Sequence, residues 1–223
     1  MKTRRVVIMG GLAVVTNPIF ARGGKAAPAQ SEYPVTTDIL LQSRNSETTA
    51  YRQYTAFSEQ AKADGYPGIA YMFKAQAAAE LIHERNFERI LTRLHGDVTP
   101  LPQHRIDVAS TQQNLMTAAS DELDCVNRRY PDIMNLLKKE GLQDAITSTN
   151  YAWESEKQHL DILKDIQRWS PSHFEAVAKK IENETAQYFV CTICGSTVIQ
   201  IPKEKCPICH LASENYRKVE API

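Results

Sequence analysis

Two short segments, ELIH at 80–83 and EKQH at 156–159, carry the residue types most able to do chemistry in this 223-residue chain. Each segment places a glutamate and a histidine three positions apart. In an α-helix both side chains then lie on one face and can reach a single point. A carboxylate and an imidazole at this spacing supply half of a site for a transition-metal ion. The alternative is that both pairs lie on solvated helix faces.

A repeat of 76 residues relates the two segments to each other. The pairs that stand 76 positions apart are Tyr54 and Tyr130, Gly65 and Gly141, Glu80 and Glu156, and His83 and His159. Shared packing could produce the tyrosine and glycine matches, but it does not readily produce the glutamate and histidine matches. The repeat therefore predicts two similar helical hairpins related by an approximate twofold axis.

Helices are the elements that must position these residues. Helix-forming residues dominate the chain from about residue 36 to 170, and we expect four helices there, at 36–63, 67–95, 109–139 and 142–169. Short connections make two antiparallel hairpins, and the longer proline-containing segment 96–108 makes the crossover between them. This order predicts an all-α, four-helix, ferritin-like bundle over residues 36–170.

Each hairpin should also supply a glutamate from its first helix. Glu47 lies seven residues before Tyr54, whereas Glu122 lies eight residues before Tyr130. The additional residue would turn Glu122 away from the equivalent face unless the third helix contains a one-residue π-bulge. Pro131 disturbs regular helical hydrogen bonding at the same place. We therefore predict a bulge between Glu122 and Pro131.

The combined set of side chains is that of a di-iron carboxylate centre. One glutamate from each of two helices and a Glu-x-x-His pair from each of the other two give carboxylates that bridge two cations and one imidazole for each ion. Open positions on the ions would admit an oxygen species. The six predicted ligands are Glu47, Glu80, His83, Glu122, Glu156 and His159.

Four cysteines near the C-terminus form a second candidate metal site. Cys191-x-x-Cys194 and Cys206-x-x-Cys209 are separated by eleven residues, a spacing suited to a tetrahedral thiolate site for zinc or a single iron. Two disulfides are an alternative outside the cytoplasm. CPICH at 206–210 also matches the pattern for c-type haem attachment, but haem would leave the first two cysteines unexplained.

The remaining sequence sets the domain limits. Residues 1–29 combine a basic start, Arg4-Arg5, a ten-residue apolar run and an Ala-Pro-Ala sequence, as in a twin-arginine-type export signal; an ordinary secretory signal is the alternative. We therefore expect an exported, periplasmic protein. A connecting helix and linker at 171–186 should join the bundle to a small four-cysteine domain at 187–219. Lys and Arg number 26, as do Asp and Glu, which argues against a nucleic-acid partner.

These segments together resemble the rubrerythrin family, in which a di-iron bundle precedes a rubredoxin-like (zinc-ribbon-type) β/loop metal domain. The resemblance covers about residues 36–218 and rests on ETTAYRQYTAF at 47–57, AELIHERN at 79–86, NLMTAASDE at 114–122, EKQH and the paired cysteine turns. It implies reduction of hydrogen peroxide to water in protection against oxidative stress. It also implies two irons in the bundle and one iron or zinc in the tail. Electrons would arrive through the rubredoxin-type iron, usually that of the partner in a head-to-tail homodimer, and the donor to that iron leaves no trace in the sequence.

The resemblance assigns roles near the di-iron site as well. Tyr54 and Tyr130 match family tyrosines that bond to iron-ligand carboxylates; the alternative is that they are core aromatics. Family members carry a further glutamate one helical turn after the Glu122 position, where this chain has Cys125. The thiol can face the metals as a soft ligand or an oxidisable group, or serve as a small buried hydrophobic residue.

Two further departures concern the tail. His210 stands where glycine is usual, and Ser196 stands where an aromatic residue is common, so iron and zinc both remain candidates there. The alternatives for function follow from these departures. One is a di-iron oxidase or ferroxidase that reacts with dioxygen, and the other is a non-enzymatic metal-binding protein with structural zinc in the tail.

Overall fold

The computed structural model describes residues 31–94, 98–99, 101–102, 105–167, 174–183 and 186–221. The predicted export signal lies outside the described residues. Among the helices that are described, none combines the length and the apolar character that a membrane crossing requires.

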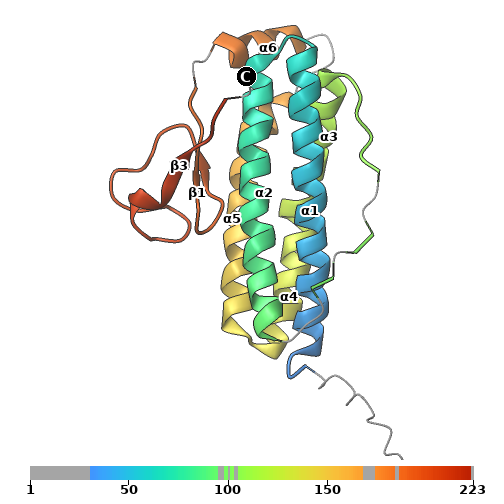
Figure 1. The fold of residues 1–223 in the computed structure, drawn as a ribbon, viewed down its shortest axis with the longest axis vertical. Helices are drawn as coiled ribbons and strands as arrows, with labels where there is room; N and C mark the ends of the chain where they lie inside the picture. The colour runs from blue at the N-terminus through green and yellow to red at the C-terminus, as the bar shows by residue number, and fades with distance from the viewer. Residues whose placement is uncertain are drawn as a thin grey trace, which may run out of the picture. The chain divides into compact units, whose positions relative to one another are not determined.

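The first helical hairpin consists of α1 (Pro34–Ala63) and α2 (Pro67–Arg93), which lie side by side along their length (Figure 1). Both helices begin with proline, whose fixed φ suits the first turn and whose missing N–H is not needed there. Gly65, at φ +86°, follows α1 in the left-handed conformation that favours glycine at this position. The predicted hairpin is therefore confirmed.

The second hairpin contains an interruption in its first helix. Its elements, in chain order, are α3 (Thr111–Asp124), the π-helical turn η1 (Cys125–Arg129), α4 (Tyr130–Glu140) and α5 (Gln143–Gln167). The predicted bulge between Glu122 and Pro131 is confirmed by η1. The wider turn absorbs the additional residue, so the Glu122 side chain points into the bundle, where it is 2% exposed.

Two clusters of buried apolar side chains occupy the two ends of the bundle. One contains Phe57, Phe73 and Leu115, and the other contains Phe87 and Leu137. Burying each of these side chains contributes about 2–3 kcal/mol. The clusters leave a polar layer between them in the middle of the bundle, and the candidate metal ligands lie in that layer.

The C-terminal part is small and rich in turns. After α6 (Phe174–Asn183) the chain forms β1 (Phe189–Cys191), β2 (Thr197–Val198), the 3-10 turn η3 (Ser213–Asn215) and β3 (Tyr216–Lys218). The strands make one antiparallel sheet in the order β2-β1-β3. The predicted fold class, a helical bundle with a small β/loop metal domain, is confirmed. Within the predicted connecting helix and linker at 171–186, α6 is the described helix, and residues 171–173 and 184–185 lie outside the described residues.

Candidate metal centres

The six side chains predicted as ligands meet in the middle of the bundle, and all are buried. They form two overlapping groups whose potential ligand atoms lie within 4.8 Å of one another: Glu47, Glu80, His83 and Glu156 in one, and Glu80, Glu122, Glu156 and His159 in the other. Glu80 and Glu156 belong to both groups. They therefore occupy the positions of bridging carboxylates, with one further glutamate and one histidine for each ion.

The distances show which histidine nitrogen faces the ligand groups. Nδ1 of His83 lies 3.1 Å from Glu80 and 3.3 Å from Glu156. Nδ1 of His159 lies 2.9 Å from Glu156 and 3.4 Å from Glu80. Each Nδ1 thus lies at similar distances from both Glu80 and Glu156, as the 76-residue repeat of the two Glu-x-x-His pairs predicts. In each ring Nδ1 is available to a metal, and Nε2 faces the other way.

Charge balance tests whether two metal ions fit this site. Burial and the neighbouring carboxylates raise the pKa of Glu47 well above its usual value, and burial raises the pKa of Glu122 to about 8. Burial opposes the charged form of His83, but its hydrogen bonds with Glu156 and Glu80 raise its pKa to about 10. Without metals, protons on Glu47, Glu122 and His83 therefore offset part of the negative charge buried in this layer. Two divalent ions, with four positive charges against four carboxylates, fit this donor set.

Metal binding should therefore displace protons. Below a pKa of about 10 for His83 and about 8 for Glu122 the metal-free groups hold protons, whereas metal binding needs both groups deprotonated. The pKa values of Glu47 and His159 are also raised well above their usual values. We therefore expect several protons to be released when the di-iron centre is filled at pH 7, and metal affinity to fall as the pH is lowered. Calorimetric titration with Zn²⁺ in buffers of different ionisation enthalpy measures this release, after the four-cysteine site has been filled. Binding without proton release would contradict the prediction.

Tyr54 and Tyr130 connect the two hairpins through the outer glutamates. The hydroxyl of Tyr54 donates to Glu122 at 2.5 Å, and that of Tyr130 donates to Glu47 at 2.8 Å. Burial raises the pKa of both phenols well above its usual value, so both remain neutral donors. Each tyrosine thus holds a carboxylate from the other hairpin in a fixed orientation, as partners of metal ligands do.

The four cysteine sulfurs meet in the C-terminal domain. Sγ of Cys191 lies 3.8 Å from that of Cys209, and Sγ of Cys194 lies 3.5 Å from that of Cys206. A disulfide needs about 2.05 Å, and all four thiols are free, so the disulfide alternative is wrong. The separations are close to about 3.8 Å, the edge of a tetrahedron with metal–sulfur bonds of about 2.3 Å. The arrangement suits iron or zinc. It places Cys206 and Cys209 of CPICH in the same four-sulfur group as the other two cysteines, which argues against haem attachment.

Gly195 and His210 occupy equivalent positions after the two cysteine turns. Their φ angles are +83° and +58°, and their N–H groups donate to the carbonyls of Cys191 and Cys206 at 2.9 and 3.0 Å. A left-handed conformation costs a residue other than glycine about 1–2 kcal/mol. His210 therefore carries a strain that the glycine usual at this position would avoid.

The loop at 192–197 lies against the face of the bundle that presents both Nε2 atoms. Four bundle side chains form hydrogen bonds with its backbone. From α2, Arg85 donates to the carbonyl of Thr192, and Asn86 donates to the carbonyl of Ile193 at 2.8 Å. From α5, Ser155 donates to the carbonyl of Gly195 at 3.0 Å, and Gln158 accepts from the N–H of Thr197 at 2.9 Å. Arg85 and Asn86 lie in the quoted segment AELIHERN and Gln158 lies in EKQH, but sequence reasoning assigned a role to none of the four. Asn86 stands three residues after His83 and Ser155 one residue before Glu156, but that proximity does not predict a partner so far along the chain.

Gly195 brings the backbone of the C-terminal part against His83. A Cβ at this position would overlap the ring of His83, with Nε2 as the nearest atom. That Nε2 has no hydrogen-bond partner among the described residues, and Nε2 of His159 lies 3.4 Å from the hydroxyl of Thr197. The backbone that touches His83 is therefore one peptide bond away from Cys194, a ligand of the other centre.

A comparison with protein families decides what this arrangement belongs to. The model of the rubrerythrin family matches residues 38–167. The chain belongs to the rubrerythrin family. This family consists of di-iron oxidoreductases, and this rubrerythrin has the carboxylate–histidine site for two irons together with a four-cysteine site for iron or zinc.

Individual relatives agree with the assignment. Rubrerythrin-2 of Clostridium acetobutylicum is 25% identical over 183 residues, which cover 82% of this chain and 96% of the relative. Nigerythrin of Nitratidesulfovibrio vulgaris is 27% identical over 170 residues, which cover 76% of this chain and 79% of nigerythrin. A mixed-valence structure of nigerythrin is similar with a TM-score of 0.69 and 25% identity, covering 98% of this chain and all of that one. A bacterioferritin from Desulfovibrio desulfuricans, at 20% identity and a TM-score of 0.60 over 67% of this chain and 88% of its own, shares the fold.

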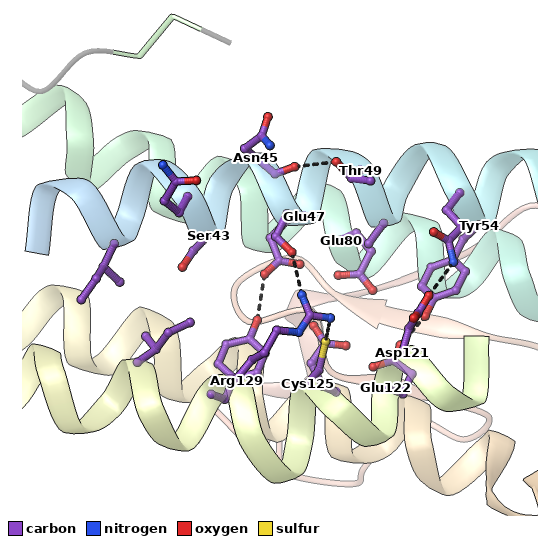
Figure 2. A pocket seen from close by; sticks show the side chains of 18 of the residues that line it. Ser43, Asn45, Glu47, Thr49, Tyr54, Glu80, Asp121, Glu122, Cys125 and Arg129 are labelled. Atoms are coloured by element: carbon purple, nitrogen blue, oxygen red, sulfur yellow. Dashed lines mark hydrogen bonds between the residues drawn. The ribbon is translucent and has the colours of Figure 1, made fainter. Parts of the chain in front are cut away.

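Cys125 of this rubrerythrin lies at the start of η1, beside the di-iron site. It lines the same cavity as the four glutamates (Figure 2) but belongs to neither group of ligand atoms. Nη2 of Arg129 lies 2.5 Å from its sulfur. Burial raises the pKa of the thiol. Sequence reasoning missed Arg129, although the spacing of four residues from Cys125 is a helical contact distance.

Ser196 and Tyr216 form a buried hydrogen-bond chain to the four-cysteine site. The Ser196 hydroxyl lies 2.8 Å from that of Tyr216, which donates to the sulfur of Cys206 at 3.3 Å. A donor to a thiolate stabilises the reduced, more negative state of an iron–thiolate centre and thereby raises its reduction potential. Ser196 thus replaces the common aromatic residue with a hydroxyl that orients Tyr216.

Replacing Tyr216 with phenylalanine should therefore lower the reduction potential of the iron-loaded site. A hydrogen bond worth about 1 kcal/mol corresponds to about 40 mV for a one-electron couple. Spectroelectrochemical titration measures the shift. Ser196→Ala, which removes only the outer hydroxyl, should shift the potential less and in the same direction. An unchanged potential in Tyr216→Phe would contradict the assignment.

Proposed function

We propose that this rubrerythrin reduces hydrogen peroxide to two molecules of water, with two protons and two electrons that reach the bundle from an iron in its four-cysteine site. When bound, two ferrous ions supply the two electrons that break the O–O bond. The observation that carries the proposal is the contact of Gly195 with His83, since it brings the backbone next to Cys194 against a predicted iron ligand. A structural zinc domain would not need this contact.

The side chains of the bundle support this chemistry from two directions. The four-cysteine domain contacts residues of α2 and α5 on the Nε2 side of the histidines. A cavity reaches the four glutamates between α1 and the segment of η1 and α4. Tyr54 and Tyr130 hold the two outer carboxylates, and their neutral hydroxyls keep a proton beside each. Electrons would enter from one side and the oxidant from the other.

Subunit arrangement and location form part of the proposal. The contact between the centres lies within one chain, and a head-to-tail homodimer that exchanged its four-cysteine domains would rebuild it between two chains. We propose that the protein acts in the periplasm after export by the twin-arginine-type signal. Fractionation of cells that produce the full chain, followed by sedimentation of the exported protein, would test both statements.

A second candidate function is a di-iron oxidase that reacts with dioxygen, and the presence of Cys125 instead of a further glutamate favours it. Metal analysis and rapid mixing distinguish the candidates. The peroxidase proposal expects about three irons per chain and oxidation of the reduced protein that is faster with hydrogen peroxide than with dioxygen. Faster oxidation by dioxygen would establish the oxidase. Zinc in the tail and no reaction with either oxidant would indicate a metal-binding protein.

Restoring a glutamate at position 125 should increase peroxide turnover. A carboxylate one turn after Glu122 would add an oxygen ligand on the cavity side of the site. We expect kcat/KM for hydrogen peroxide to rise several-fold in Cys125→Glu, measured with the reduced protein under anaerobic conditions. Cys125→Ser, which removes the thiol without adding a carboxylate, is the control and should show no such rise. A kcat/KM in Cys125→Glu no higher than that of the parent would contradict the prediction, and a lower kcat/KM in Cys125→Ser would show that the thiol contributes to the reaction.

A further inference from the structure

The cavity beside the di-iron site is longer than the site itself. Its volume is about 560 Å³, and its lining on α1 extends from Asp38 to Tyr54, which is about 24 Å of helix at about 1.5 Å per residue. The part lined by Glu47 and the other three glutamates is the metal site. The part lined by Asp38, Ile39, Ser43 and Ile133 lies beyond the ligands, towards the start of α1.

Hydrogen peroxide does not account for a cavity of this size. The volume includes the space between the four glutamates that the metal ions would take. A water molecule takes about 30 Å³ of liquid, so a molecule with two oxygens would fill only a small part of the space beyond the ions. Sites for small organic ligands measure about 300–1,000 Å³, the range in which this cavity falls. The size therefore points to an occupant with an organic group.

Ser43 indicates where such an occupant would lie. Its side chain is buried, with 6% exposed, and its hydroxyl has no hydrogen-bond partner among the described residues. Figure 2 shows Ser43 pointing from α1 into the cavity, one turn before Glu47. A buried hydroxyl without a partner costs about 1–3 kcal/mol, a cost that a ligand with a polar atom at this point would remove. The half-buried side chains of Ile39 and Ile133 supply apolar surface on the same stretch.

The charges around the cavity indicate an uncharged occupant. Of the described residues that line it, Arg129 alone is cationic. Its guanidinium forms an ion pair with Asp124 at 3.2 Å, donates to Ser46 at 3.2 Å and to the sulfur of Cys125, and its Nε has no hydrogen-bond partner among the described residues. The charge of Asp124 therefore offsets that of Arg129. Asp38, at the outer end of the cavity, would repel an anionic tail.

We propose that this cavity binds uncharged organic hydroperoxides, with the hydroperoxide group towards Glu47, the organic group between Ile39 and Ile133, and a polar atom at Ser43. The proposal rests on the proposed function, which supplies the electrons. The O–O bond breaks, the hydroperoxide takes up two electrons and two protons, and an alcohol and water leave. Hydrogen peroxide would use only the inner end of the cavity.

Binding is tested without turnover. The full chain is loaded with zinc, which is redox-inert, and is titrated with 2-phenyl-2-propanol, the alcohol formed from cumene hydroperoxide. The isoleucine methyl signals are followed by NMR. We expect saturable shifts at Ile39 and Ile133, and their loss in Ser43→Phe, where the ring fills the cavity. Asn135→Phe adds the same ring at an exposed position of α4 outside the lining and should bind like the parent. No shift at millimolar alcohol would overturn the proposal.

Turnover separates this inference from the proposed function. The measured quantity is the ratio of kcat/KM for cumene hydroperoxide to kcat/KM for hydrogen peroxide in the iron-loaded protein. We expect the ratio to fall at least about tenfold in Ser43→Phe, equivalent to about 1.4 kcal/mol, and to stay at the parent value in Asn135→Phe. Ile133→Trp narrows the same stretch and replaces Ser43→Phe if that variant does not fold. Reduction of hydrogen peroxide alone would overturn the inference and leave the proposed function standing, whereas reduction of neither peroxide would overturn both.

Discussion

Gly195→Ala is expected to slow electron transfer from the four-cysteine iron to the di-iron centre by at least about tenfold, since a misplacement of about 1 Å at an active site can cost about 10²-fold. The new methyl group would overlap the ring of His83, whose place is set by the ligand group. The loop at 192–197 must therefore move away from the bundle. Rapid mixing of the variant with hydrogen peroxide, while the iron–thiolate absorbance is followed, measures the transfer.

Gly65→Ala is the matched control for this variant. Gly65 has φ +86°, close to the +83° of Gly195, but a Cβ there meets no atom within 4 Å. Both substitutions therefore carry the same backbone strain of about 1–2 kcal/mol, and only one separates the centres. Unchanged transfer in Gly195→Ala would mean that electrons reach the di-iron centre by another route, such as another chain. Equal slowing in both variants would mean that strain alone is responsible.

Glu156→Gln is expected to remove the di-iron centre. Glu156 contributes to both ligand groups, with oxygens 3.3 Å from His83 and 2.9 Å from His159. An amide of the same shape cannot bridge two cations and leaves three carboxylates against four positive charges. Losing a hydrogen-bond partner of a ligand costs about 10–100-fold in metal affinity, and losing a bridging ligand should cost more. We expect the iron content to fall from about three to about one per chain and peroxide turnover to disappear.

Glu154→Gln controls for the loss of one carboxylate on the same helix. Glu154 is partly exposed and pairs with Lys157, and its replacement should leave both metal content and turnover at parent values. The iron–thiolate absorbance of Glu156→Gln should also persist, because the four cysteines form a ligand group that does not include Glu156. Retention of all three irons in Glu156→Gln would exclude Glu156 as a bridging ligand.

The sequence by itself determined the ligand types and the elements that carry them. Glu-x-x-His pairs on helices, repeated after 76 residues, predicted the inward-facing groups because helix geometry relates residues three positions apart regardless of context. Counting eight residues instead of seven between Glu122 and Tyr130 predicted the π-bulge now seen as η1. The paired cysteine turns predicted a tetrahedral site for the same reason, since each turn is local. In all three cases the residues compared lie within one helix or one turn, so their separation in the sequence sets their distance in space.

Tertiary structure decided how the two centres meet and what lies beside them. Asn86 and Ile193 are 107 residues apart, and Ser155 and Gly195 are 40 apart; no local rule relates such positions, and only the docking of two domains brings them together. The Ser43 hydroxyl, which has no hydrogen-bond partner among the described residues, likewise faces a cavity only because residues of η1 and α4 form the opposite wall. Contacts of this kind depend on which surfaces pack together, and the free energy of that packing is spread over many side chains that carry no motif.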